Sequence, residues 1–189
     1  METFPEYVKD PGINLEVYGM IHQSLKHLSY TALFTAGAVL LSGLSFPAGP
    51  ARVFPFQHAI NVLAGILIGP WYGTVAALLA GLIRMSLGTG TIFSLPGGIP
   101  GVIMVGLAYR YLKKDWVAFI EPLGTGPIGA TLSALVVAPY LGLTGTLAFF
   151  QSAFLASSIP GCLIGFLLVR ALRKVSRFSL GEQESPGSP

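Results

Sequence analysis

The sequence predicts an all-α integral membrane protein with six transmembrane helices and both termini in the cytoplasm. Its 189 residues are 52% hydrophobic and only 10% charged. Soluble domains carry roughly 25% charged residues, so this composition indicates a lipid environment. The charges are also widely spaced, because residues 85–109 and 122–169 contain none. Each of these stretches can hold one or two apolar spans of about 20 residues, the length that crosses a bilayer.

A short extension is expected before the bundle and a tail after it. In residues 1–27, Asn14 is suited to cap a short amphipathic helix at the cytoplasmic interface. This start is acidic, whereas a secretory signal begins with basic residues, so we do not expect a cleaved signal. Residues 28–174 form the expected transmembrane domain. Residues 175–189 are mostly polar and include several serine, proline and glycine residues, which predicts a disordered cytoplasmic tail.

Turn residues divide the central domain into six apolar spans. Pro70 is expected to separate the second span from the third, because proline begins or ends helices. Glycine and proline residues predict that 87–98 is a turn rather than a helix. We expect Pro122 and Pro127 to interrupt the fifth span. The expected spans cover approximately residues 28–46, 56–70, 70–87, 99–112, 117–138 and 146–172.

Small residues in two of these spans predict close contacts between helices. Gly73, Ala77 and Gly81 form a stripe along the third span. Gly161 and Gly165 have a GxxxG spacing in the sixth. Without large side chains, neighbouring backbones can approach each other closely at such positions.

Basic residues close the fourth and sixth spans and set the expected topology. The positive-inside rule places both clusters in the cytoplasm, so we expect both termini in the cytoplasm and a multi-pass protein of the cytoplasmic (inner) membrane. The net charge of +3 then needs no nucleic-acid partner. Loops 46–55, 87–96 and 140–145 share the outer face. The two basic clusters are Arg110, Lys113 and Lys114, and Arg170, Arg173, Lys174 and Arg177.

A polar cluster marks the start of the second span. Gln57, His58 and Asn61 lie three and four residues apart, so a helix presents them on one face. Such side chains either form hydrogen bonds between helices or bind a ligand. We favour a ligand, because an outer loop adjoins them. Thr89 and Thr91, in the second outer loop, either join this site or satisfy backbone groups of the turn.

Two ionisable residues lie within expected spans. Arg84 is costly in a bilayer, and two interpretations remain open: it faces protein, water or ligand, or it extends to the outer interface. Glu121 could be a proton-relay carboxylate. We favour an acid at the cytoplasmic interface that pairs with Lys113 or Lys114.

Motifs of several functional classes are missing from the sequence. The single cysteine, Cys162, excludes an internal disulfide and a cysteine metal cluster. His58 has amide neighbours and is a poor metal site by itself, so no metal is expected. The glycine-rich string LGTGT lacks the lysine of a phosphate-binding loop. Since GxSxG, HExxH and an acidic magnesium cluster are also missing, we expect neither an enzyme nor a bound cofactor.

Two strings in the sequence resemble those of a known family. GPARVFPFQHAINVLAGILIGPWY covers the first outer loop and the second span, and Arg84 is followed by LGTGT and a Pro-Gly turn. With the length and the number of spans, these strings resemble the ThiW family, substrate-binding S components of energy-coupling factor (ECF) vitamin importers associated with thiamine metabolism. The resemblance is densest from Phe46 to Gly101 and weaker through 124–129.

The resemblance implies an S-component bundle that captures a thiamine precursor, hydroxyethylthiazole, from outside the cell. It also implies protein partners in the lipid bilayer and cytoplasm, namely the transmembrane scaffold EcfT and two ATPase subunits that bind the ATP. Ala32 and Ala36 match the AxxxA surface on which the family docks to EcfT.

A thiazole ligand suggests roles for residues near the outer face. A neutral heteroaromatic ring needs apolar contacts, for which Phe54, Phe56 and Phe93 are candidates. Its ring nitrogen and hydroxyl need hydrogen bonds. The polar candidates are Gln57, His58, Asn61, Arg84, Thr89 and Thr91.

Two other functions are kept as alternatives. An ion-coupled secondary transporter would need internal repeats and an ionisable pair near the membrane midplane, and the sequence reveals neither a repeat nor a partner for Glu121. A membrane scaffold without a ligand is suggested by the small-residue stripes.

Overall fold

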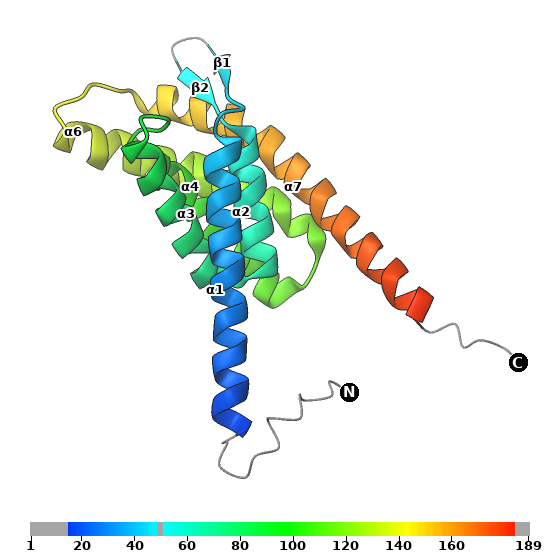
Figure 1. Ribbon diagram of the computed structural model, residues 1–189. Coiled ribbons are helices and arrows are strands. Elements are labelled where there is room, and N and C mark those ends of the chain that lie inside the picture. The colour runs from blue at the N-terminus through cyan, green and yellow to red at the C-terminus, as the bar shows by residue number, and fades with distance from the viewer. Residues whose placement is uncertain (1–14, 49–50, 184–189) are drawn as a thin grey trace, which may run out of the picture.

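The computed structural model describes residues 15–48 and 51–183, which form a helical bundle with one small hairpin (Figure 1). The expected all-α class is confirmed. The bundle has five helices, α1, α2, α3, α4 and α7, and a sixth helical segment built of several helix types. This segment covers residues 115–140 and is called the rod below. The bounds are α1 Leu15–Leu41, β1 Phe46–Ala48, β2 Ala51–Val53, α2 Pro55–Leu67, α3 Gly69–Ser86, α4 Ser94–Leu112 and α7 Leu147–Gln183.

Helix α1 is longer at its start and shorter at its end than expected. It begins at Leu15, so the expected amphipathic helix and first span are one continuous helix. No proline interrupts residues 15–41, and nothing else there ends a helix. The expected end at Phe46 is wrong, because the turn after Leu41 tightens, with Leu44 N–H donating to the Leu41 carbonyl at 3.0 Å.

The first expected outer loop contains a β-hairpin. Strands β1 and β2 pair antiparallel, with Phe46 opposite Val53 and Ala48 opposite Ala51. Pro55 follows the hairpin directly and is the first residue of α2, where a missing N–H costs nothing. The hairpin therefore leads straight into the polar turn of α2.

Helix α2 is the central helix of the bundle. It has 13 residues, a length of about 20 Å, and nearly all of them are buried against α1, α3, α4 and α7. Gly69 ends it with a φ of +82°, a conformation that favours glycine. Pro70 then lies in the first turn of α3, so the expected boundary at this proline is confirmed.

Helix α4 begins earlier than expected. Residues 94–98 were expected to be turn, but α4 starts at Ser94. Pro96 lies in the first turn, where helices tolerate proline, and the Gly97 N–H already donates to the Phe93 carbonyl at 3.0 Å.

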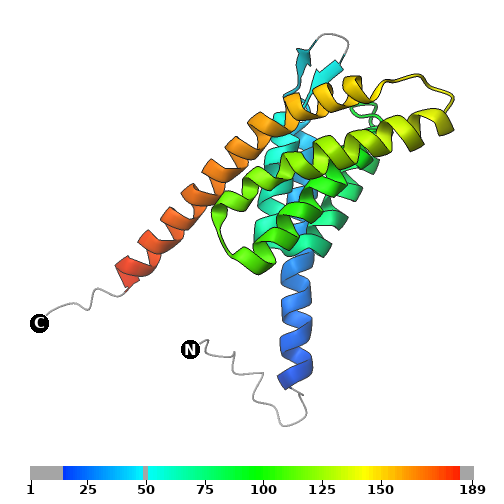
Figure 2. The same cartoon turned by 180° about the vertical axis from the view of Figure 1, so that it is seen from behind.

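The fifth expected span is a continuous rod, so the expected interruption at its prolines is wrong. It combines a 3₁₀ helix (Asp115–Ile120), α5 (Glu121–Leu123), two π-helical sections (Gly124–Ala130 and Ser133–Val137) and α6 (Ala138–Tyr140). Pro122 falls in the first turn of α5, and Pro127 lies inside the wider π section. Figure 2 shows this rod lying across α4 and against the first half of α7.

Glycines allow the helices to approach closely, as the small-residue stripes predicted. A Cβ on Gly161 would lie 2.5 Å from the Pro55 carbonyl oxygen, and one on Gly165 would lie 2.7 Å from Cβ of Val62. On α3, a Cβ on Gly73 would lie 2.8 Å from Cγ2 of Val102. Helix α7 therefore packs directly on α2, and α3 on α4.

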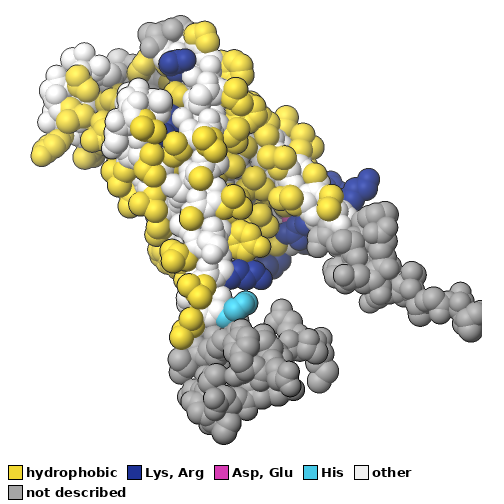
Figure 3. Space-filling model, in the orientation of Figure 1, with side chains coloured by type: hydrophobic (Ala, Val, Ile, Leu, Met, Phe, Trp, Pro, Cys, Tyr) yellow, Lys and Arg dark blue, Asp and Glu magenta, His cyan; other side chains and the backbone are white. Residues whose placement is uncertain are grey.

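The two ends of the bundle differ. The start of α1 and the end of α7 lie at one end, whereas the hairpin and the connection from α6 to α7 lie at the other (Figures 1 and 2). Apolar side chains cover the surface between the ends, and basic side chains gather near the lower end in Figure 3. By length and composition, two of the described helical segments can cross a membrane: residues 115–140 and 147–175.

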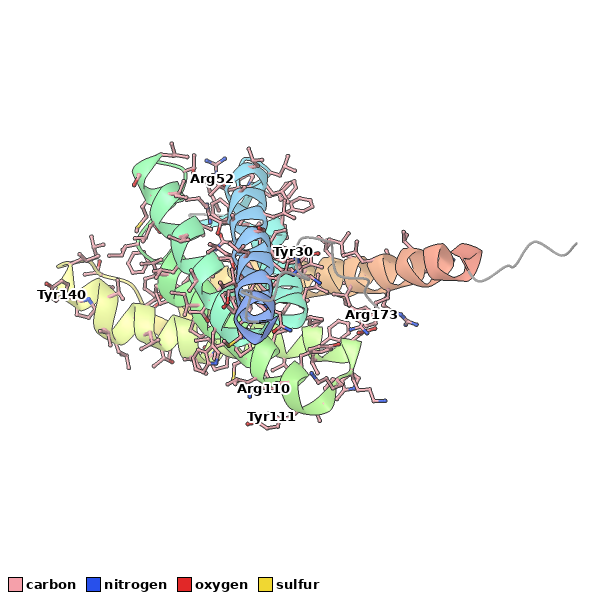
Figure 4. All side chains as sticks on the ribbon, turned by 60° about the horizontal axis from the view of Figure 1, so that its bottom comes forward. Tyr30, Arg52, Arg110, Tyr111, Tyr140 and Arg173 are labelled. Carbon is pink, nitrogen blue, oxygen red and sulfur yellow. The ribbon has the colours of Figure 1, made fainter. Side chains whose placement is uncertain are left out.

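Basic residues and one acid form a network at the lower end. Arg173 of α7 pairs with Asp115 at 3.0 Å and donates to the Tyr109 hydroxyl at 2.5 Å. Figure 4 shows Arg110 projecting near the end of α4 and Arg173 projecting from α7. Arg173 of the second basic cluster therefore contacts Tyr109 and Asp115, which flank the first cluster in the sequence.

We predict that Gly165→Ala destabilises the protein by about 1–3 kcal/mol, because its methyl group would overlap Val62 on α2. Thermal unfolding of the detergent-purified protein measures the change. Gly37→Ala is the matched control: its Cβ would meet only Cδ1 of Ile60 at 3.6 Å, so stability should stay unchanged or rise by up to about 1 kcal/mol, because alanine favours a helix interior over glycine. Equal effects of both substitutions would contradict the close packing of α7 on α2.

Candidate functional site

A cavity of about 410 Å³ lies at the hairpin end of the bundle. Its walls come from β2, α2, the loop between α3 and α4, the start of α4 and the first turns of α7. The volume falls within the range of roughly 300–1,000 Å³ that is typical of small-molecule sites. Its polar and aromatic lining residues are Phe54, Gln57, His58, Arg84, Thr89, Thr91, Phe93, Ser94, Phe149, Phe150, Phe154 and Ser157, with Arg52 also on the wall.

A second hollow, of about 470 Å³, lies at the opposite end. Charged side chains line it, among them Asp115, Arg170, Arg173 and Lys174, and none of its described lining residues is aromatic. The cavity at the hairpin end is therefore the better candidate for a ligand with a ring.

Phenylalanines form one wall of the candidate cavity. The ring centroids of Phe93 and Phe150 are 4.8 Å apart, and those of Phe150 and Phe154 are 6.0 Å apart. Phe149 contacts Phe150 edge-on at 5.4 Å. Such offset and edge-on contacts are the favourable ones between aromatic rings, and they leave apolar faces for a flat ligand.

Arg84 is buried at the end of α3 and faces this cavity. Only 1% of its surface is exposed. Its Nη1 donates to Oε1 of Gln57, and its Nη2 donates to the Thr89 carbonyl at 3.2 Å. The guanidinium carbon lies 4.4 Å from the centre of the Phe54 ring. Of the two interpretations of Arg84, extension to the interface is therefore wrong.

The loop after α3 folds back around Arg84. The N–H groups of Thr89 and Gly90 donate to the Arg84 carbonyl at 2.9 and 3.1 Å. Gly88 provides the required turn with a φ of +69°. The Thr89 hydroxyl donates to the same carbonyl at 3.3 Å. Thr89 and Thr91 are both exposed, and both lie on the cavity wall.

A buried network links α2 to the rod over residues 115–140. Nδ1 of His58 lies 2.7 Å from Oε1 of Glu121, and the Thr125 hydroxyl donates to the same oxygen at 2.8 Å. Gly101 of α4 lies against this oxygen, and any Cβ there would overlap it. The glycine therefore makes space for the carboxylate.

The favoured interpretation of Glu121 was wrong. Its side chain is fully buried and pairs with His58, not with Lys113 or Lys114. A 3₁₀ helix begins the rod at Asp115, and Glu121, the first residue of α5, lies inside the bundle with no exposed surface. A carboxylate that is completely removed from solvent needs such partners.

Two of the expected site residues lie outside the cavity wall. Asn61, one turn further along α2 than Gln57 and His58, is buried and donates to the Gly98 carbonyl at 3.3 Å. Phe56 is half-buried and does not line the cavity. Helical spacing puts Asn61 on the same face of α2 as Gln57 and His58, but the cavity does not extend as far along α2 as Asn61.

Sequence reasoning missed the contribution of α7. Phe149, Phe150 and Phe154 line the cavity, as does Ser157, whose hydroxyl accepts a hydrogen bond from the Phe54 N–H at 3.1 Å. The aromatic spacing at the start of the sixth expected span was the available signal. It could not be separated from the pattern of a lipid-facing helix.

The site has the donor set of an organic-ligand pocket and not that of a metal centre. Among residues 15–48 and 51–183, no three His, Cys, Asp or Glu side chains come together as a metal site. The lone His–Glu pair leaves only one imidazole nitrogen free for further contact.

Comparison with known families agrees with this architecture. Residues 28–175 match the family described as thiamine-precursor transporter protein (ThiW). The chain belongs to the ThiW family. No curated protein gives a significant match. The resemblance drawn from the two sequence strings is thus confirmed at the family level, and ThiW is a family of membrane transporters, not one described by a catalytic activity.

We predict that Arg84→Lys lowers the free energy of unfolding by about 1–3 kcal/mol. Lysine keeps the charge but lacks the planar fork, so it cannot bond Gln57 and the Thr89 carbonyl together while stacking on Phe54. Thermal denaturation measures the loss. Arg52→Lys is the matched control, because Arg52 is exposed and should tolerate the change within about 0.5 kcal/mol. A stable Arg84→Lys protein would contradict the buried fork.

Proposed function

We propose that this ThiW chain is the substrate-capture subunit of an ECF-type importer that binds hydroxyethylthiazole. The observation that carries the proposal is the cavity at the hairpin end, which combines an aromatic wall with buried hydrogen-bonding groups. A thiazole ring suits the phenylalanines. Its ring nitrogen and hydroxyl suit Arg84 and His58. The family's description as thiamine-precursor transporters supports this choice of ligand.

The proposed topology places the cavity outside the cell. Basic residues gather at the opposite end, where the positive-inside rule predicts cytoplasm. In this proposal α1, α2, α3, α4, the rod and α7 are the six spans of an inner-membrane protein. The short α2 does not need to face lipid over its whole length, because its neighbours bury it.

The chain would obtain its energy from partners. We propose EcfT and two cytoplasmic ATPases, with ATP bound by those subunits and no cofactor on this chain. Ala32 and Ala36 are exposed on α1, one turn apart, so another helix could approach them closely.

A second candidate is an ion-coupled transporter that acts alone. The His58–Glu121 pair favours it, because such a transporter needs an ionisable pair within the bundle, and the sequence alone revealed no partner for Glu121. Uptake of the thiazole into liposomes that contain only this chain, driven by a proton gradient, would support this candidate and contradict the ECF proposal.

We predict that the purified protein binds hydroxyethylthiazole and that His58→Ala weakens binding about ten- to hundred-fold. The loss corresponds to one buried hydrogen bond, about 1–3 kcal/mol. Isothermal titration calorimetry measures the affinity. His27→Ala is the matched control, since His27 of α1 stacks on Tyr72 of α3 and is not on the cavity wall. No binding by the wild-type protein would contradict the proposed ligand.

We predict that Ala32→Trp or Ala36→Trp abolishes co-purification with EcfT and leaves ligand binding intact. An indole in either position would prevent the close approach of a partner helix. Ala156→Trp, at an exposed alanine of α7, is the matched control and should still co-purify. If the α1 variants co-purify as well as the control, the proposed docking surface is wrong.

A further inference from the structure

The His58 imidazole is held by Glu121 on one side and faces the cavity on the other. Nδ1 is the atom that meets Glu121, at 2.7 Å. His58 lines the cavity, whereas Glu121 and Thr125 do not. Nε2 points away from Nδ1 and is not among the buried side-chain atoms that lack a partner, so it keeps accessible surface and is the ring nitrogen that a ligand can reach. Among the described residues, the ring makes no other hydrogen bond.

The network around Glu121 decides which ring nitrogen carries the proton. Oε1 of Glu121 already accepts the Thr125 hydroxyl at 2.8 Å. The same oxygen therefore acts as an acceptor toward His58, and Nδ1 donates. In a neutral imidazole with its hydrogen on Nδ1, Nε2 has a free lone pair and accepts a hydrogen bond.

The buried charges near the His58 ring are one of each sign. The buried side chains at this end already include one cation, Arg84, and one anion, Glu121. With a neutral imidazole between them, the buried charges at this end sum to zero. Arg52, the other cation on the cavity wall, is exposed and can be hydrated.

Arg84 supplies hydrogen-bond donors to the same cavity. A guanidinium only donates hydrogen bonds. Among residues 15–48 and 51–183 no carboxylate pairs with it, and its buried Nε lacks a partner. Within this cavity Arg84 therefore offers hydrogen-bond donors, and Nε2 of His58 offers an acceptor.

We propose that Glu121 is a positioning residue that fixes His58 with Nε2 as an acceptor toward the cavity. The site then selects ligands that place a hydroxyl donor at His58 and an acceptor atom at Arg84. For hydroxyethylthiazole this assigns the side-chain hydroxyl to His58 and the ring nitrogen to Arg84. The ligand assignment rests on the proposed function, whereas the state of His58 does not.

Nitrogen NMR of histidine tests the state of His58 without any ligand. The chain has three histidines, so His22→Gln with His27→Gln leaves one, and a purification tag free of histidine keeps the spectrum clear. With ¹⁵N-histidine in the ligand-free protein, we expect a protonated Nδ1 and an unprotonated Nε2. Glu121→Met, which removes the acceptor, should lose this preference. A protonated Nε2 in the protein with Glu121 intact overturns the proposal.

Ligand selectivity tests the positioning role. The probes are hydroxyethylthiazole and its analogue with ethyl in place of hydroxyethyl. The protein with Glu121 intact should bind hydroxyethylthiazole about ten-fold or more tightly than the ethyl analogue, a ratio of affinities that corresponds to one buried hydrogen bond. Glu121→Met should reduce the ratio to below about three-fold, and Glu121→Gln, which keeps an acceptor oxygen, should largely restore it. A purely structural role would weaken both ligands equally and leave the ratio unchanged, which overturns the proposal.

Thr125→Val gives a second route if Glu121→Met does not fold. It removes the hydroxyl that supports Oε1, so the ratio should fall in the same direction by a smaller factor. An unchanged ratio counts against the network. If the wild-type protein binds neither thiazole, the proposed function fails, and the NMR spectrum alone then decides whether Glu121 fixes His58.

Discussion

The polar first turns of α2 have to find hydrogen-bond partners inside the protein, and the surrounding helices are arranged to supply them. Gln57 is met by Arg84 of α3, His58 by Glu121 of the rod, and Asn61 by the α4 backbone at Gly98. In an apolar environment an unpartnered group of this kind costs several kcal/mol. The need to satisfy three side chains therefore ties three other elements to one end of α2, and the cavity lies where they converge.

Glycine positions make this convergence possible. Gly101 leaves space for the Glu121 carboxylate, and Gly161 lets α7 lie directly on the first turn of α2. The π-helical section after Glu121 has wider turns and accommodates Pro127 without ending the rod. The polar groups of the candidate site are thus carried on closely packed helices, whereas Thr89 and Thr91 lie on a loop at its rim.

Much of the fold could be predicted from local pattern, and the part that failed depended on tertiary contacts. Apolar runs and turn residues gave the helices, and polar side chains in an apolar chain marked Gln57, His58 and Arg84. Glu121 is 63 residues away from His58, so no spacing rule connects them. The phenylalanines of α7 were missed because lipid-facing and cavity-facing aromatic residues have the same pattern. The predicted helix ends were wrong at the start of α4, which tolerates Pro96 in its first turn, and at the end of α1, where the turn after Leu41 tightens.

The geometry of Glu121 also bears on how transport is driven. A carboxylate that couples ion flow has to exchange its proton with both sides of the membrane, which requires polar or hydrated neighbours along a path. Glu121 is fully buried, and within the described residues its Oε2 has no hydrogen-bond partner. A carboxylate held in this way suits a constant role, orienting His58 toward the ligand. Energy for releasing a tightly held ligand would then come from outside the chain, in line with the partner ATPases that we propose.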